Sequence, residues 1–182
     1  MSDIETVHKV YVGIGSNIEP IAHIKKCIKS LKENFSNLQL SPIYESSSMG
    51  FDGPNFYNLA AFFETKNDLV SLKELLNDIE TQNGRSLGEV KFSSRTLDID
   101  ILYYDDIIDE EKNIPRSEII KFDFVLRPLY DLAPGHIHPN TRKTHNKMLA
   151  DDIYQKMIIK RISLPLTAVS YTHLRAHETS AD

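Results

Sequence analysis

Residues 94–103, SRTLDIDILY, contain the pattern around which the rest of the chain is organised. From residue 97 to residue 103 this pattern predicts a β-strand, because two kinds of side chain alternate with the period of two residues that a strand imposes. One face of the strand is expected to carry Leu97, Ile99, Ile101 and Tyr103, and the other face Asp98, Asp100 and Leu102. The strand therefore presents two carboxylates beside each other on one face.

The two carboxylates, Asp98 and Asp100, are candidate metal ligands. Along a strand their Cα atoms lie about 6–7 Å apart, which suits a pair of divalent cations separated by about 3.5–4 Å. Mg²⁺ prefers one or two carboxylates together with phosphate and water oxygens, and Arg95, just before Asp98, can reach a polyphosphate held there. The alternative is a solvated strand face that binds nothing. Aspartate is depleted in strands, so two aspartates within one apolar run favour the metal site.

Length and composition predict one soluble domain. The chain has 182 residues, of which 41% are apolar and 26% charged. Its net charge of −5 argues against a general nucleic-acid binder but not against an anionic substrate, because a metal can supply positive charge. The sole cysteine, Cys27, is expected to be a packed thiol. No apolar run reaches the ~18 residues of a membrane span and the N-terminus lacks a signal-peptide pattern, so we expect a cytoplasmic protein.

The predicted elements follow the order strand, helix, strand, strand, helix, strand. This is the ferredoxin-like pattern, an α+β fold with helices packed on an antiparallel sheet. Helices are predicted where apolar residues recur every three or four positions, and strands where short apolar runs end in turn residues. Lysines 25, 26, 29 and 32 fall mainly off the apolar stripe of the first helix and predict a solvated face. The predicted strands are 10–14, 38–44, 58–65 and 97–103, and the predicted helices run over 20–34 and from Asn67 or Asp68 to Gly84.

Four other segments affect the interpretation. Residues 15–17, Gly-Ser-Asn, predict a tight turn rather than a phosphate loop, because neither GxGxxG nor GxxxxGK[ST] is present. Residues 124–126 predict another short strand. His136 and His138 are disfavoured as metal ligands, because no third ligand stands near them in the sequence. Residues 164–182 have neither helical nor strand periodicity and are expected to be a non-native or disordered tail, which leaves residues 1–163 as the domain.

Together these pieces resemble the 6-hydroxymethyl-7,8-dihydropterin pyrophosphokinase family of the folate pathway. Members of this family transfer pyrophosphate from ATP to the hydroxymethyl group of the dihydropterin and release AMP. The resemblance implies an enzyme with these two small-molecule substrates and two Mg²⁺ ions, a monomer without nucleic-acid or membrane partners. It covers residues 10–150, and its motifs are Gly15-Ser16-Asn17, Asn58, Gly84-Arg85, RTLDID at 95–100, and FVLRPL at 124–129.

The resemblance also implies roles for individual residues. Aromatic side chains would enclose the flat pterin ring, and an amide would read its edge. The catalytic positions are matched by Arg85, Arg95, Asp98 and Asp100, of which the two aspartates are the metal ligands. The ATP side is matched by Asn77, Glu80, Ile101 and Arg116. The pterin side is matched by Ser46, Ser47, Ser48, Met49 and Gly50 in one loop, and by Phe56, Asn58, Phe92 and Phe124.

Three positions depart from the family pattern. Leu87 replaces a loop arginine, Arg116 replaces a histidine, and Phe122 replaces an arginine. Arg116 and Lys121 compensate in charge but not in geometry. The departures leave open a catalytically weakened relative that binds nucleotide or pterin. A third hypothesis is a ferredoxin-like RNA-binding module, which needs exposed aromatics on the sheet with basic neighbours. The two aspartates oppose it, because they occupy the sheet where RNA phosphates would pass.

Overall fold

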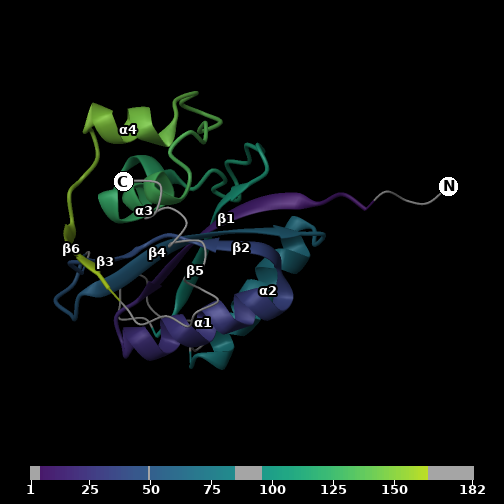
Figure 1. Ribbon diagram of the computed structural model, residues 1–182, viewed down its shortest axis with the longest axis horizontal. Helices are drawn as coiled ribbons and strands as arrows, with labels where there is room; N and C mark the ends of the chain where they lie inside the picture. The colour runs from purple at the N-terminus through teal and green to yellow at the C-terminus, as the bar shows by residue number, and fades with distance from the viewer. Residues whose placement is uncertain (1–4, 49, 85–95, 164–182) are drawn as a thin grey trace, which may run out of the picture.

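The computed structural model of the protein describes residues 5–48, 50–84 and 96–163. Its centre is an antiparallel sheet of six strands in the order β5-β1-β4-β3-β6, with β2 also paired to β4. Helices α1 and α2 cover one face of the sheet, and α3 and α4 cover the other (Figure 1). The strands are β1 (His8–Ser16), β2 (Ser36–Leu40), β3 (Ile43–Ser46), β4 (Phe56–Thr65), β5 (Asp98–Tyr104) and β6 (Ile158–Ile162). The helices are α1 (Pro20–Asn34), α2 (Leu69–Gln82), the 3₁₀ turn η1 (Ser117–Ile120), α3 (Asp123–Leu132) and α4 (His145–Asp151).

The predicted ferredoxin-like core is confirmed, with one change in its second strand. The predicted strand 38–44 is two strands, β2 and β3, because Pro42 between them has no N–H to give to a ladder. Ser41 spans the break, since its Oγ accepts a hydrogen bond from the Ala60 N–H at 2.8 Å and its own N–H donates to the Ala60 carbonyl at 2.9 Å. Both strands therefore still pair with β4.

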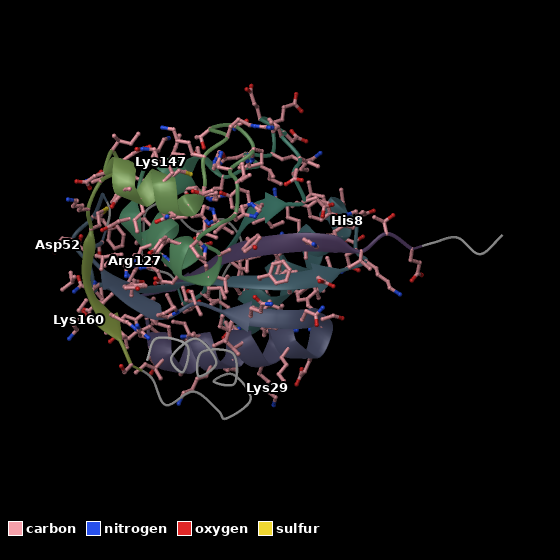
Figure 2. All side chains as sticks on the ribbon, turned by 45° about the horizontal axis from the view of Figure 1, so that its top comes forward. His8, Lys29, Asp52, Arg127, Lys147 and Lys160 are labelled. Carbon is pink, nitrogen blue, oxygen red and sulfur yellow. The ribbon has the colours of Figure 1, made fainter. Side chains whose placement is uncertain are left out.

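The larger of two apolar clusters lies between the sheet and helices α1 and α2. Helix α1 contributes a buried stripe that includes Ile24, Cys27 and Leu31. The predicted packed thiol is confirmed, and burial raises the pKa of Cys27 above its usual range. On the opposite side of the same helix Lys29 points away from the sheet, as predicted for the lysine face (Figure 2).

The predicted face of Tyr103 is wrong. Val12 pairs with Ile101 but Tyr11 pairs with Tyr103, so Leu102 is an extra residue in β5 and forms a bulge. Leu102 and Tyr103 both belong to the second, smaller apolar cluster beneath α3 and α4. The bulge lies after the aspartates, so Asp98 and Asp100 keep their predicted common face.

The strand predicted at 124–126 is also wrong, because these residues lie in helix α3. Leu126, Leu129 and Leu132 recur every three residues and are buried between α3 and the sheet, which stabilises a helix in spite of Pro128 inside it. Helix α4 and strand β6 had no predicted counterpart. The predicted tail, residues 164–182, lies outside the described residues. Within the part of the chain that is described, no helix combines the length and the apolar character needed to cross a membrane.

Candidate active site

Two cavities meet at the edge strand β5, and each has a volume of about 180 Å³. The first lies on the α3 side of the sheet and is lined by Phe56, Asn58 and Phe124 among others. The second lies beside α2 and is lined by Asn77 and Glu80 among others. Three charged residues line both cavities: Asp98, Asp100 and Arg116. The predicted carboxylate pair therefore stands at the junction between the two spaces.

Two glycines of β1 lie beside the carboxylates. Gly15 pairs with Asp98, and Gly13 pairs with Asp100. Directly paired residues of an antiparallel ladder point to the same face, so the neighbouring strand places no side chain next to either carboxylate. The side chain of Asp100 keeps 30% of its surface exposed. The site can therefore admit ligands from both cavities.

Asn58 is buried in the first cavity and its orientation is set by hydrogen bonds. Its Nδ2 donates to Ser46 Oγ at 2.8 Å and to the Tyr44 carbonyl at 3.4 Å. A Cβ atom placed on Gly15 would lie 3.3 Å from Asn58 Oδ1, so this oxygen fills the space that the glycine leaves. Since both donor bonds come from Nδ2, Oδ1 is the atom that Asn58 can offer to a ligand.

Aromatic rings form two walls of the first cavity. The Phe51 ring meets Phe56 edge to face, with centroids 6.3 Å apart and an angle of 87°. The Phe122 ring stacks on Phe124 at 5.2 Å and 17°. Phe51 lines the cavity and was not predicted as a site residue. Phe122, which departs from the family pattern, stacks on Phe124 from outside the set of lining residues.

The loop after β3 is fixed by its own polar contacts. Ser48 Oγ donates to the Gly53 and Pro54 carbonyls at 2.9 and 2.6 Å, and Asn17 Nδ2 donates to the same Pro54 carbonyl at 3.1 Å. Ser46 and Ser47 line the first cavity as predicted. Ser48 instead holds the loop together, and Gly50 is not among the lining residues.

All four residues predicted on the ATP side line the second cavity: Asn77, Glu80, Ile101 and Arg116. Glu80 is buried, and its Oε2 accepts a hydrogen bond from the Ile99 N–H at 3.1 Å. This bond fixes helix α2 to β5 between the two aspartates. Lys73 and Lys112 line the same cavity and were not predicted. The position of Lys73, one helical turn before Asn77, was the available signal for it.

Arg116 is held at the junction by its backbone and its side chain. Its N–H donates to the Leu102 carbonyl of β5 at 3.0 Å. Its Nη2 lies 3.4 Å from Asp100 Oδ1, and its Nε donates to Glu118 Oε2 at 2.6 Å. Burial alone lowers the pKa of the Arg116 guanidinium, but the carboxylates of Asp100, Glu118 and Asp98 outweigh it and raise that pKa. The guanidinium therefore stays charged.

The donor set at the junction fits Mg²⁺. No group of three or more potential ligands is present among the described residues, but Mg²⁺ needs only one or two carboxylates when phosphate and water complete its shell. Asp98 and Asp100 would supply these oxygens. Four predicted site residues, Arg85, Phe92, Arg95 and Met49, lie outside the described residues.

Comparison with known proteins identifies the family to which these features correspond. Residues 11–134 match the model of the family described as 7,8-dihydro-6-hydroxymethylpterin-pyrophosphokinase (HPPK). The chain is 36% identical over 140 residues to the 2-amino-4-hydroxy-6-hydroxymethyldihydropteridine pyrophosphokinase of Aquifex aeolicus, with 74% of this chain and 86% of that protein covered. For the Haemophilus influenzae protein of the same name, the identity is 32% and the coverage is 72% of this chain and 86% of that protein.

Longer proteins also match. A folic acid synthesis protein of Dictyostelium discoideum is 34% identical, with 76% of this chain but 22% of that protein covered. Among solved structures, Plasmodium falciparum HPPK-DHPS superposes with a TM-score of 0.64 at 12% identity. That superposition covers 82% of this chain and 46% of the Plasmodium chain. At this identity it supports the fold alone.

Proposed function

The chain belongs to the 7,8-dihydro-6-hydroxymethylpterin-pyrophosphokinase family, and on this premise we propose that it transfers pyrophosphate from ATP to 6-hydroxymethyl-7,8-dihydropterin in folate biosynthesis. The observation that carries the proposal is the position of Asp98 and Asp100 at the junction of the two cavities. One cavity has the aromatic walls that a flat ring needs, and the other opens between helix α2 and the basic side chains Lys73 and Lys112.

The pterin is assigned to the first cavity. Phe56 and Phe124 offer ring faces, and Asn58 Oδ1 offers an acceptor for an N–H at the edge of the pterin. Asn58 lies on β4, two strands further into the sheet than the aspartates of β5, with only Gly15 of β1 between it and Asp98. A ring held by its amide would therefore extend toward β5. The hydroxymethyl group would then face the carboxylates.

ATP is assigned to the second cavity, with its phosphates toward Asp98, Asp100 and Arg116. The hydroxymethyl oxygen attacks the β-phosphorus, the bond from this phosphorus to the α,β-bridging oxygen breaks, and the hydroxyl proton is lost as AMP leaves. Asp98 and Asp100 would hold Mg²⁺, for which we propose two ions, and the metal would supply positive charge against the phosphate oxygens. The residues of the chain hold the two substrates in line, and Arg116 adds a fixed cation.

The catalytically weakened relative is the competing proposal. It rests on Arg116 and Phe122, which carry different side chains from the family pattern. Arg116 nevertheless lines both cavities, and Phe122 stacks on Phe124, which lines the first cavity. We therefore favour an active enzyme, built as one domain over residues 1–163 and working as a monomer.

Incubation of the protein with ATP, Mg²⁺ and 6-hydroxymethyl-7,8-dihydropterin tests the proposal. We expect AMP and the dihydropterin diphosphate in equal amounts. Stoichiometric ADP would contradict pyrophosphoryl transfer. Binding of both substrates without a nucleotide product would support the weakened relative instead. Omission of Mg²⁺, with a chelator present, should abolish AMP formation.

A further inference from the structure

Glu118 lines the first cavity but has no place in the mechanism above. It lies in η1, directly before Ile119, which is fully buried in the smaller apolar cluster. On the other side of the turn, Arg116 is bonded through its N–H to the Leu102 carbonyl at 3.0 Å. The backbone at both ends of the turn is therefore fixed, and the two side chains are set against each other at the junction.

The contacts of the Arg116 guanidinium are unequal. The Nε–H group donates to Glu118 Oε2 at 2.6 Å, and Nη2 donates to Glu118 Oε1 at 3.4 Å. Asp100 meets the same Nη2 at 3.4 Å. Glu118 is thus the nearer carboxylate, and it binds the guanidinium along one edge. Among the described residues no acceptor contacts Nη1, so the two N–H groups of Nη1 form the edge that a ligand can use.

We propose that Glu118 is a positioning residue that turns the Arg116 guanidinium so that only Nη2 approaches Asp100, at 3.4 Å, which limits its competition with Mg²⁺ for that carboxylate and directs the Nη1 edge to nucleotide phosphate. The inference rests on the proposed function of the two cavities. Among the described residues, the other carboxylates that act on the Arg116 guanidinium are those of Asp100 and Asp98, and a guanidinium binds a carboxylate through two parallel N–H groups. In that position it would compete with the divalent cation for the same oxygens.

The test uses Glu118→Gln, which keeps the shape of the side chain and removes its charge. The measured quantity is the Mg²⁺ concentration that half-saturates binding of α,β-methylene-ATP, followed by calorimetry. We expect this concentration to rise about tenfold, the size typical of a lost charged hydrogen bond. Glu111→Gln is the matched control, because Glu111 is exposed and its loss changes the net charge equally. It should shift the midpoint less than about twofold.

A double-mutant cycle distinguishes two effects of Glu118. One is the positioning of Arg116, and the other is a direct electrostatic attraction between the Glu118 carboxylate and the bound cations. In an Arg116→Gln background, Glu118→Gln should change the Mg²⁺ midpoint less than about twofold, because the residue through which it acts is gone. An equal effect in both backgrounds would overturn the proposal, and so would an unchanged midpoint in the single variant.

A nucleotide-free measurement keeps the test independent of the proposed function. Hydrogen exchange of the Arg116 Nε–H, followed by NMR, should be about tenfold faster in Glu118→Gln than in the wild-type protein. Unchanged exchange would refute the positioning contact itself. If the wild-type protein releases AMP and the cycle is additive, only the role of Glu118 fails. If the wild-type protein neither binds the analogue nor releases AMP, the proposed function fails.

Discussion

Asp98 and Asn58 lie on one row of the sheet, with Gly15 as the residue between them. Two strand spacings separate their backbones, about 10 Å, and the middle position carries no side chain. The surface from the buried Asn58 amide to the Asp98 carboxylate is therefore not interrupted by a side chain of β1. This surface connects the space assigned to the pterin with the space assigned to the phosphates.

Gly15→Ala should weaken pterin binding. The new Cβ would lie 3.3 Å from Asn58 Oδ1 and 3.8 Å from Phe56 Cδ1, so the amide must shift in its pocket. We expect the KM for the dihydropterin to rise about tenfold, as for the loss of one well-placed hydrogen bond, while the KM for ATP changes little. Gly135→Ala is the control, since Gly135 lies outside both cavities and nothing lies within 4 Å of a Cβ placed there. Equal effects of the two variants on the KM for the dihydropterin would contradict this role of Gly15.

Asp100→Asn keeps the shape of a side chain that the metal proposal requires to be charged. Turnover, measured as AMP release, should fall by several orders of magnitude, because both phosphate positioning and charge stabilisation depend on the carboxylate. The melting temperature should change little, since the Ile99 and Ile101 face of β5 is untouched. Asp106→Asn, an exposed change of equal charge in the turn after β5, serves as control. A folded Asp100→Asn protein with wild-type turnover would end the metal interpretation.

The fold should lose stability below neutral pH through His145. Burial lowers the pKa of His145 to about 4, and its ring is fixed by Tyr103 Oη at 2.9 Å and the Ala133 carbonyl at 2.8 Å. The unfolded chain takes up this proton near pH 6.5, so it binds more protons than the folded protein between pH 6.5 and pH 4. The stabilisation is therefore complete above pH 6.5 and is lost as the pH falls toward 4, by at most about 3 kcal/mol.

Urea unfolding at pH 7 and pH 4.5 measures this effect as a change in the free energy of unfolding. His145→Gln should show a smaller pH dependence than the wild-type protein, whatever its stability at pH 7. His23→Gln, at the start of α1 and outside the Tyr103 contacts, should keep the wild-type dependence. Parallel pH profiles for His145→Gln and the wild-type protein would show that His145 does not contribute.

Removal of residues 164–182 should leave folding and AMP release nearly unchanged, because that segment has no amphipathic pattern. The matched truncation removes residues 157–182, and with them strand β6. It deprives β3 of one of its two neighbouring strands and Asp123 of the Met157 and Ile158 N–H groups. We expect a melting temperature within about 3 °C of the full chain for the first truncation and a larger fall for the second, since ~1 kcal/mol shifts a domain of this size by about 2–4 °C. A large fall for the first would make the tail part of the fold.

Local periodicity determined the core of this protein. The Pro20–Asn34 helix, the Asp98–Tyr104 strand and the βαββαβ order were all predictable, because an amphipathic helix or strand repeats its apolar residues at a fixed period. The same reasoning placed Asp98 and Asp100 on one face. The sequence match to the family motifs then predicted many of the residues that line the two cavities, but it missed Phe51, Lys73, Lys112 and Glu118, and it included Ser48 and Gly50, which do not line them.

Only the tertiary structure decided the remaining features, because each depends on contacts between residues that no local period connects. The β5 bulge turned Tyr103 to the α3 side through its pairing with Tyr11. Helix α3 replaced a predicted strand because Leu126, Leu129 and Leu132 pack against the sheet. The role of Gly15 depends on its pairing with Asn58 on one neighbouring strand and with Asp98 on the other. The role of Glu118 depends on its contact with the Arg116 guanidinium, which lies near Asp100 because the Arg116 N–H is bonded to the Leu102 carbonyl. Sequence alone therefore determined that Asp98 and Asp100 share one face of a strand, and packing across the sheet decided which side chains surround them and how they are held.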